Sequence, residues 1–166
     1  MLAAIRTTGL GVLGAIGLIC VATQVYAEEH SHKPAAHKTG QSLNQGAKLE
    51  TDEVLRHGME NIRQLMASKQ EAIAQDQLRT QDYQLLAEAV GKNISHIVKN
   101  CKLPKKSDAA FHSIVLADMT QSNDIMRASP KYQAQRAAAL GVLQSLRNYG
   151  EYFQHPGWQL NNVQPR

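Results

Sequence analysis

The sequence has few aromatic residues, two cysteines and none of the common catalytic motifs. Phe, Trp and Tyr make up 5% of the residues, and no segment alternates apolar and polar side chains with a period of two, so a β-sheet is not expected. The cysteines do not form a CxxC motif. There is no glycine-rich phosphate loop and no HExxH or Ser-His-Asp pattern. We therefore do not expect an enzyme.

No apolar run reaches the roughly 20 residues that span a bilayer. The longest, at residues 9–22, follows Arg6 and leads into "TQVYA", which presents the small residues Val25 and Ala27 where a signal peptidase cuts. Residues 1–27 are predicted to be a secretory signal, with a membrane anchor as the alternative. The mature chain would begin at Glu28 in the bacterial periplasm, without membrane contact after cleavage.

The remaining chain is long enough for one compact domain with its own core. The formal net charge of +4 includes a contribution from Arg6, and the other basic residues are scattered along the chain, so nucleic acid is not an expected partner. Cleavage of the signal removes Cys20 and leaves Cys101 alone. A single thiol in an oxidising compartment requires burial, a metal or a partner, and pairing between two chains would give a homodimer.

Helical periodicity dominates the second part of the sequence. Residues 28–49 are polar without a periodic apolar face, and we interpret them as a mobile tail. Capping residues and short breaks then divide residues 50–166 into four helices. These are expected from Thr51 to about Gln75, Thr80 to about Cys101, Ser107 to about Ala128, and Ser129 to Gln154. Short connections between long helices predict an all-α, antiparallel up-down-up-down four-helix bundle.

Four metal-ligating side chains are predicted to gather at one end of this bundle, one from each helix. On a uniform helical wheel Met59, Cys101 and His112 share the apolar stripe of their helices, whereas His96 points outward. His155 ends the fourth helix at the same end of the bundle. Each also has a plain structural explanation, as core filler, inert thiol, hydrogen-bonded core histidine and helix cap respectively.

A thiolate and a thioether are soft ligands, and imidazole suits copper, zinc and iron. A set of two histidines, a cysteine and a methionine therefore favours copper over zinc, which more often takes Cys and His without Met. Met59, Cys101, His112 and His155 are therefore predicted copper ligands. A second set lies in the tail. If cleavage follows Ala27, the new amine and the third residue, His30, with two amide nitrogens between them, form a square-planar set for Cu(II) or Ni(II), and His32 and His37 lie nearby. The alternative is a tail that is merely polar.

Two stretches carry a resemblance to a known family. An exported four-helix bundle with a methionine early in helix one, in "LRHGMENIRQLM", and a histidine ending helix four, in "LRNYGEYFQH", resembles the periplasmic b-type cytochromes. The resemblance implies haem ligation by Met59 and His155, although His155 falls about one turn later than in the family. The CxxCH motif of related c-type proteins is missing. The elements "NCKLP", "FH" and "HPGW" are also similar to small exported proteobacterial proteins of unassigned function.

Three functions are therefore expected in order. The first is a periplasmic metal-binding bundle, with copper as the metal, that serves electron transfer or metal handling together with a periplasmic redox or metal-handling protein. The second is a b-type haem electron-transfer protein. The third is a structural or chaperone-like interaction bundle without a cofactor, in which the four predicted ligands do not converge.

Overall fold

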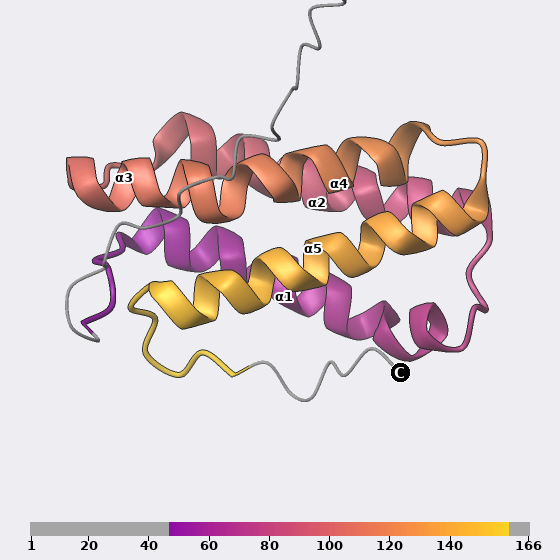
Figure 1. Cartoon of the computed structure of the whole chain (residues 1–166), viewed down its shortest axis with the longest axis horizontal. Helices are drawn as coiled ribbons and strands as arrows, with labels where there is room; N and C mark the ends of the chain where they lie inside the picture. The colour runs from indigo at the N-terminus through magenta and orange to yellow at the C-terminus, as the bar shows by residue number, and fades with distance from the viewer. Residues whose placement is uncertain (1–46, 160–166) are drawn as a thin grey trace, which may run out of the picture. The chain divides into compact units, whose positions relative to one another are not determined.

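The chain folds into antiparallel helices that lie side by side (Figure 1). The structure, a computed structural model, describes residues 47–159. The helices are α1 (Glu53–Ala74), α2 (Thr80–Asn100), α3 (Lys105–Phe111), α4 (Ala117–Ala128) and α5 (Tyr132–Tyr152). A π-helical turn, η2 (His112–Leu116), joins α3 to α4, so that α3, η2 and α4 form one continuous third helix.

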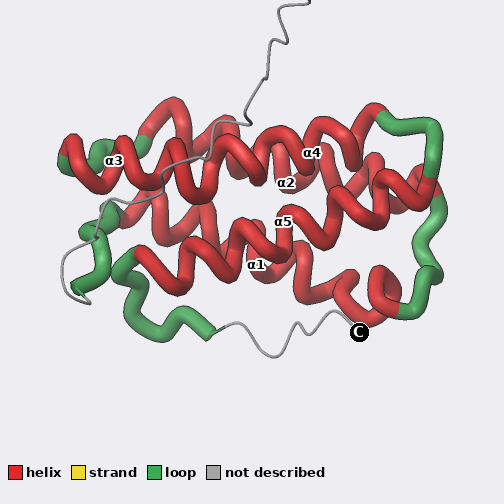
Figure 2. Tube along the Cα trace, viewed as in Figure 1, coloured by secondary structure: helices red, strands yellow, loops and turns green. Residues whose placement is uncertain are grey.

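Neighbours in sequence are neighbours in space. The helix α1 packs on α2, α2 on α4, and α4 on α5, and α5 closes the ring against α1. Figure 2 shows that, within residues 47–159, helix fills the length of the molecule and loops lie at its two ends. The predicted all-α four-helix bundle is confirmed.

The bundle has a single apolar core to which every helix contributes. Its largest fully buried side chains are the aromatic residues Tyr83, Tyr149 and Phe153. Exposing such large apolar rings to water would cost much of the free energy of folding. The first helix adds Leu55, Met59, Ile62, Met66 and Ile73 at helical spacing. The periodicity that predicted the helices therefore also identified the faces that they bury.

The helix starts differ from the predicted caps by one to three residues. Asp52, not Thr51, caps α1, because its Oδ1 accepts a hydrogen bond from the Leu55 amide at 2.7 Å. Thr51 donates instead to the Gln154 carbonyl. The third helix begins at Lys105, so that Ser107 lies buried within it.

Glycines lie where helices approach most closely. A Cβ on Gly58 of α1 would collide with the Ile97 side chain of α2, whose Cδ1 would be 2.6 Å away. A Cβ on Gly141 of α5 would likewise collide with the Ser122 side chain of α4. The absence of a side chain therefore sets the spacing of two of the four helix pairs.

The π-helical turn keeps the third helix in contact with the core. Four buried residues of the third helix recur at a strict spacing of four: Ser107, Phe111, Val115 and Met119. In a regular helix of 3.6 residues per turn this spacing drifts around the helix. The extra residue taken up by η2 offsets that drift.

None of the helices within residues 47–159 combines the length and the apolar character needed to cross a membrane.

Replacement of Gly58 by Ala tests the close approach of α1 and α2. Alanine favours a helix by about 1 kcal/mol over glycine, but the overpacking against Ile97 should cost about 1–3 kcal/mol. We expect a net loss of unfolding free energy in chemical denaturation. In a double-mutant cycle, Ile97→Ala should relieve the collision, so that the pair destabilises by less than the sum of the single variants. Additive effects would contradict close packing at Gly58.

Candidate functional site

The Asp52 carboxylate organises the end of the bundle where α1 begins and α2 ends. Besides capping α1, it accepts a hydrogen bond at Oδ2 from the Lys102 amide at 2.5 Å. It also accepts one from the Cys101 thiol. One side chain therefore satisfies donors from both helices and holds the Cys101 segment in place.

Cys101 is a half-buried free thiol at the C-terminal cap of α2. Burial, together with the nearby carboxylates of Asp52 and Asp108, raises the pKa of this thiol to about 11. Both carboxylates disfavour the thiolate, which is the form that binds metals and attacks electrophiles. The surroundings of Cys101 therefore keep it protonated at neutral pH.

Tyr149 and His155 form a hydrogen-bonded pair next to this cysteine. The Tyr149 side chain is fully buried, and burial raises the pKa of its hydroxyl. The hydroxyl lies 3.0 Å from Nδ1 of His155, the partner that a buried phenol requires. With the tyrosine protonated, the hydroxyl donates and the neutral imidazole accepts.

The residues after α5 fold back over the bundle end and hold His155 there. Pro156 and Gly157, with a φ of 79° at Gly157, make a turn closed by the Trp158 amide donating to the His155 carbonyl at 3.0 Å. The Trp158 ring packs on Tyr149 at 4.8 Å between centroids, in space left by Gly150. The imidazole thus packs against two aromatic rings.

A short clamp joins the two ends of the described chain. Leu49 forms a parallel bridge with Phe153: its amide donates to the Tyr152 carbonyl, and its carbonyl accepts from the Gln154 amide, both at 2.8 Å. Lys48 adds a hydrogen bond from its ammonium group to the Gly150 carbonyl. The segment entering α1 is therefore fixed to the segment leaving α5.

The structure places the four predicted core ligands in different surroundings. Met59 is fully buried, as predicted, in the apolar core. His155 is half-buried, and its nearest charges include Glu60, the residue after Met59, which pairs with Arg63. His96 is exposed, which confirms its outward placement.

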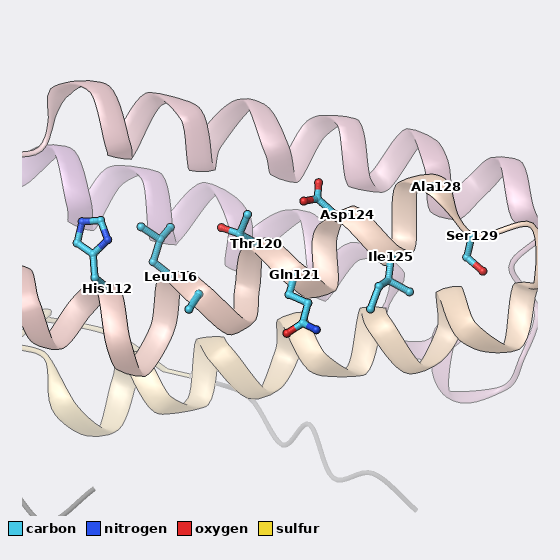
Figure 3. Close-up of a pocket in the computed structure, with 9 residues that line it drawn as sticks. His112, Leu116, Thr120, Gln121, Asp124, Ile125, Ala128 and Ser129 are labelled. Carbon is cyan, nitrogen blue, oxygen red and sulfur yellow. The ribbon is translucent and has the colours of Figure 1, made fainter. Parts of the chain in front are cut away.

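The prediction that His112 faces the interior is wrong. Its side chain is 58% exposed and lies 3.8 Å from the Asp108 carboxylate, one turn earlier. The uniform wheel failed because η2 begins at this residue, and a π turn shifts the angular position of all the residues before it relative to those after it. Figure 3 shows His112 on the side of the third helix that also carries Leu116, Thr120 and Asp124.

His155 contacts Tyr149, and Cys101 lies close enough to contribute to the raised pKa of the Tyr149 hydroxyl, whereas the neighbours of His112 are Phe111 and Asp108. Within residues 47–159 no three His, Cys, Asp or Glu side chains are grouped so that they could hold a metal ion. The tail histidines His30, His32 and His37 lie outside the described residues.

The haem ligation that the resemblance implies does not fit this arrangement. A haem bound by Met59 and His155 needs open space between them, yet Met59 has no exposed surface. The imidazole uses Nδ1 for Tyr149 and lies 4.9 Å from the Trp158 ring centroid. A flat macrocycle would have to displace these packed rings.

Sequence reasoning missed Asp52 and Tyr149 as the residues that build this end. Asp52 directly precedes an apolar helical pattern, which is a capping signal. Tyr149 continues the buried stripe of Val142 and Leu146, so its position could have been predicted. Its hydrogen bond to His155 could not, because that depends on the turn at Gly157.

No protein-family model, curated protein or solved structure gives a significant match to this chain.

The Cys101 thiol should react slowly. A pKa of about 11 lowers the thiolate fraction about 100-fold relative to a thiol with a pKa near 9, partly offset by higher nucleophilicity. We expect iodoacetamide at pH 8 to alkylate the folded chain at least ~10-fold more slowly than the chain in denaturant, as measured by mass spectrometry. Asp52→Asn keeps a capping side chain and should speed the reaction. Equal rates in folded and unfolded chains would contradict this environment.

Stability should depend on the protonation of His155. Burial first, and then the charges of Arg56 and Arg63, lower the pKa of this imidazole below its ordinary value of 6.5, against the opposing charge of Glu60. Stability from the neutral imidazole is therefore complete above pH 6.5 and is lost as the pH falls through the lower folded-state pKa. We expect thermal unfolding between pH 7.5 and 5 to show this loss in the native chain, and to show less of it in His155→Gln. His57→Gln, at an exposed site, should behave like the native chain.

Proposed function

We propose that this protein is an exported copper-binding protein whose Cu(II) is held by the amino terminus of the processed chain. The observation that carries the proposal is the sequence Glu28-Glu29-His30 directly after the predicted cleavage site at Ala27. The terminal amine, two deprotonated amide nitrogens and the His30 imidazole supply four nitrogens in one plane, the geometry that Cu(II) prefers. His32 and His37 would add donors nearby.

The surroundings of the bundle residues support this location over a core site. The Cys101 thiol is held protonated beside two carboxylates, and His112 stands apart in solvent. A four-nitrogen site stabilises Cu(II) rather than cycling between oxidation states, so metal handling fits better than electron transfer. The bundle then acts as the folded body that carries the metal-binding segment.

Two histidine variants test the proposal. Protein purified from the periplasm should begin at Glu28 by mass spectrometry and bind one equivalent of Cu(II) with the visible and EPR spectra of four nitrogen ligands. His30→Gln should abolish that spectrum, because it removes the imidazole at the third position. His57→Gln, at an exposed position of α1 outside the tail, is the control and should retain it. A spectrum unchanged in His30→Gln, or an amino terminus other than Glu28, would refute the proposed site.

One observation favours a second function, an interaction bundle without cofactor. Leu85 and Val98 on α2 and Ile125 on α4 are large apolar side chains with 59%, 56% and 41% of their surface exposed. Protein that binds no metal and shows no haem Soret band would support this function instead.

A further inference from the structure

The outer face of α4 carries a shallow groove of about 930 Å³ that no other helix covers within residues 47–159. Figure 3 shows the side chains that line it, from His112 in η2 to Ser129 after α4. The lining is mostly apolar, and Ile125 has 41% of its surface exposed there. Apolar surface gathered in one exposed place marks an interaction site.

This groove lacks the charges that the outer face of a helix normally carries. On α2 the outward positions hold the exposed ion pair between Glu88 and Lys92. Along α4 the residues Ala117, Gln121 and Ala128 point outward, and all three are exposed and uncharged. Depletion of charged side chains at its centre is what distinguishes a protein interface from the rest of a protein surface.

The residues of the groove also match one another in reverse order. Ala117 and Ala128 lie equally far from the middle of α4. The same is true of Gln121 and Asp124, which lie between them. The spacing of these residues, four, three and four, is that of a coiled-coil seam. A two-fold axis through the middle of α4 would place a second α4 antiparallel to the first, with like facing like at the alanines and each Gln121 facing an Asp124. Such self-complementarity is what a symmetric dimer requires.

We propose that this groove binds a second copy of the chain, with α4 packed antiparallel on α4 across a two-fold axis. The contact runs along one helix of 12 residues and is therefore small. We expect a dimer with a Kd on the order of 10 µM. Neither Cys101 nor any residue of the proposed copper site takes part in the contact, so the two proposals are tested separately.

The side chains that meet across the axis are chemically matched. The alanines at both ends of the seam allow the two helix backbones to approach closely. Each Gln121 amide donates a hydrogen bond to the Asp124 carboxylate of the other copy. The two Asp124 carboxylates repel one another little, because each already pairs with Arg127 of its own helix at 2.7 Å. Ile125 flanks the seam, so the axis brings the two copies of this side chain to the same side, where they cover each other.

Disulfide trapping of the full processed chain tests the register of the two helices. In a Cys101→Ser background, Ala117→Cys combined with Ala128→Cys should give covalent dimers on mild oxidation, because the two positions face each other across the axis. Within one chain they lie about 16 Å apart along the helix and cannot bond. Each single variant should remain monomeric on non-reducing gels, because its two copies are equally far apart. Absence of covalent dimer in the double variant, or equal cross-linking of a single variant, would overturn the proposal.

Sedimentation in metal-free buffer tests the contact without cysteine. Between about 1 and 200 µM the native chain should pass from monomer to dimer. Ala128→Lys places a charged side chain in the seam and should raise the dimer Kd at least ~10-fold, with the melting temperature of the monomer unchanged. Ala67→Lys makes the same change at an exposed alanine of α1 and should leave the Kd unaltered.

Three results would contradict this dimer. A native chain that stays monomeric at every concentration would show that the groove binds no second copy. Equal weakening by the two lysine variants would report a general effect of charge. A dimer that persists in Ala128→Lys and is lost in Cys101→Ser would place the contact at the thiol instead of α4.

Discussion

The Asp52 carboxylate is the constraint on which the end of the bundle around Cys101 and Tyr149 depends. Helix termini leave backbone groups unpaired, and here the first turn of α1, the Lys102 amide and the Cys101 thiol share one acceptor. That sharing fixes the start of α1 to the end of α2. It also gives Cys101 a neighbour of the wrong charge for a metal-binding thiolate. The carboxylate that stabilises the start of α1 and the end of α2 therefore also disfavours metal binding by the Cys101 thiol.

The histidine at the end of α5 has a structural explanation that needs no ligand. A tyrosine buried in the last turn of a helix must find a hydrogen-bond partner for its hydroxyl, and the turn at Pro156 and Gly157 returns an imidazole to it at 3.0 Å. Trp158 then covers the pair. The aromatic cluster and the polar pair stabilise one another, because neither could be buried alone without loss.

The predictable part of the structure is the part governed by regular periodicity. The spacing of Leu55, Met59 and Ile62 identified both a helix and its buried face, and the same argument placed His96 outside. It failed for His112, because a wheel assumes uniform rotation and the third helix contains a π turn. The partners of Cys101 and His155 could not be predicted. Asp52 lies about 50 positions before Cys101 and Lys102 in the sequence. The contact of His155 with Tyr149 depends on the direction of a turn, which helical periodicity does not predict.

The clamp between Leu49 and Phe153 bears on the order in which the molecule assembles. Contacts between successive helices close short loops, whereas the bonds from Lys48 and Thr51 to the far end join residues 102 and 103 positions apart. Loop closure over such distances is slow and costs more chain entropy than the local helix pairs. The ring of helices can therefore form before the clamp between Leu49 and Phe153 closes. A chain delivered from its amino end cannot complete that clamp until Gly150 and Gln154 have arrived.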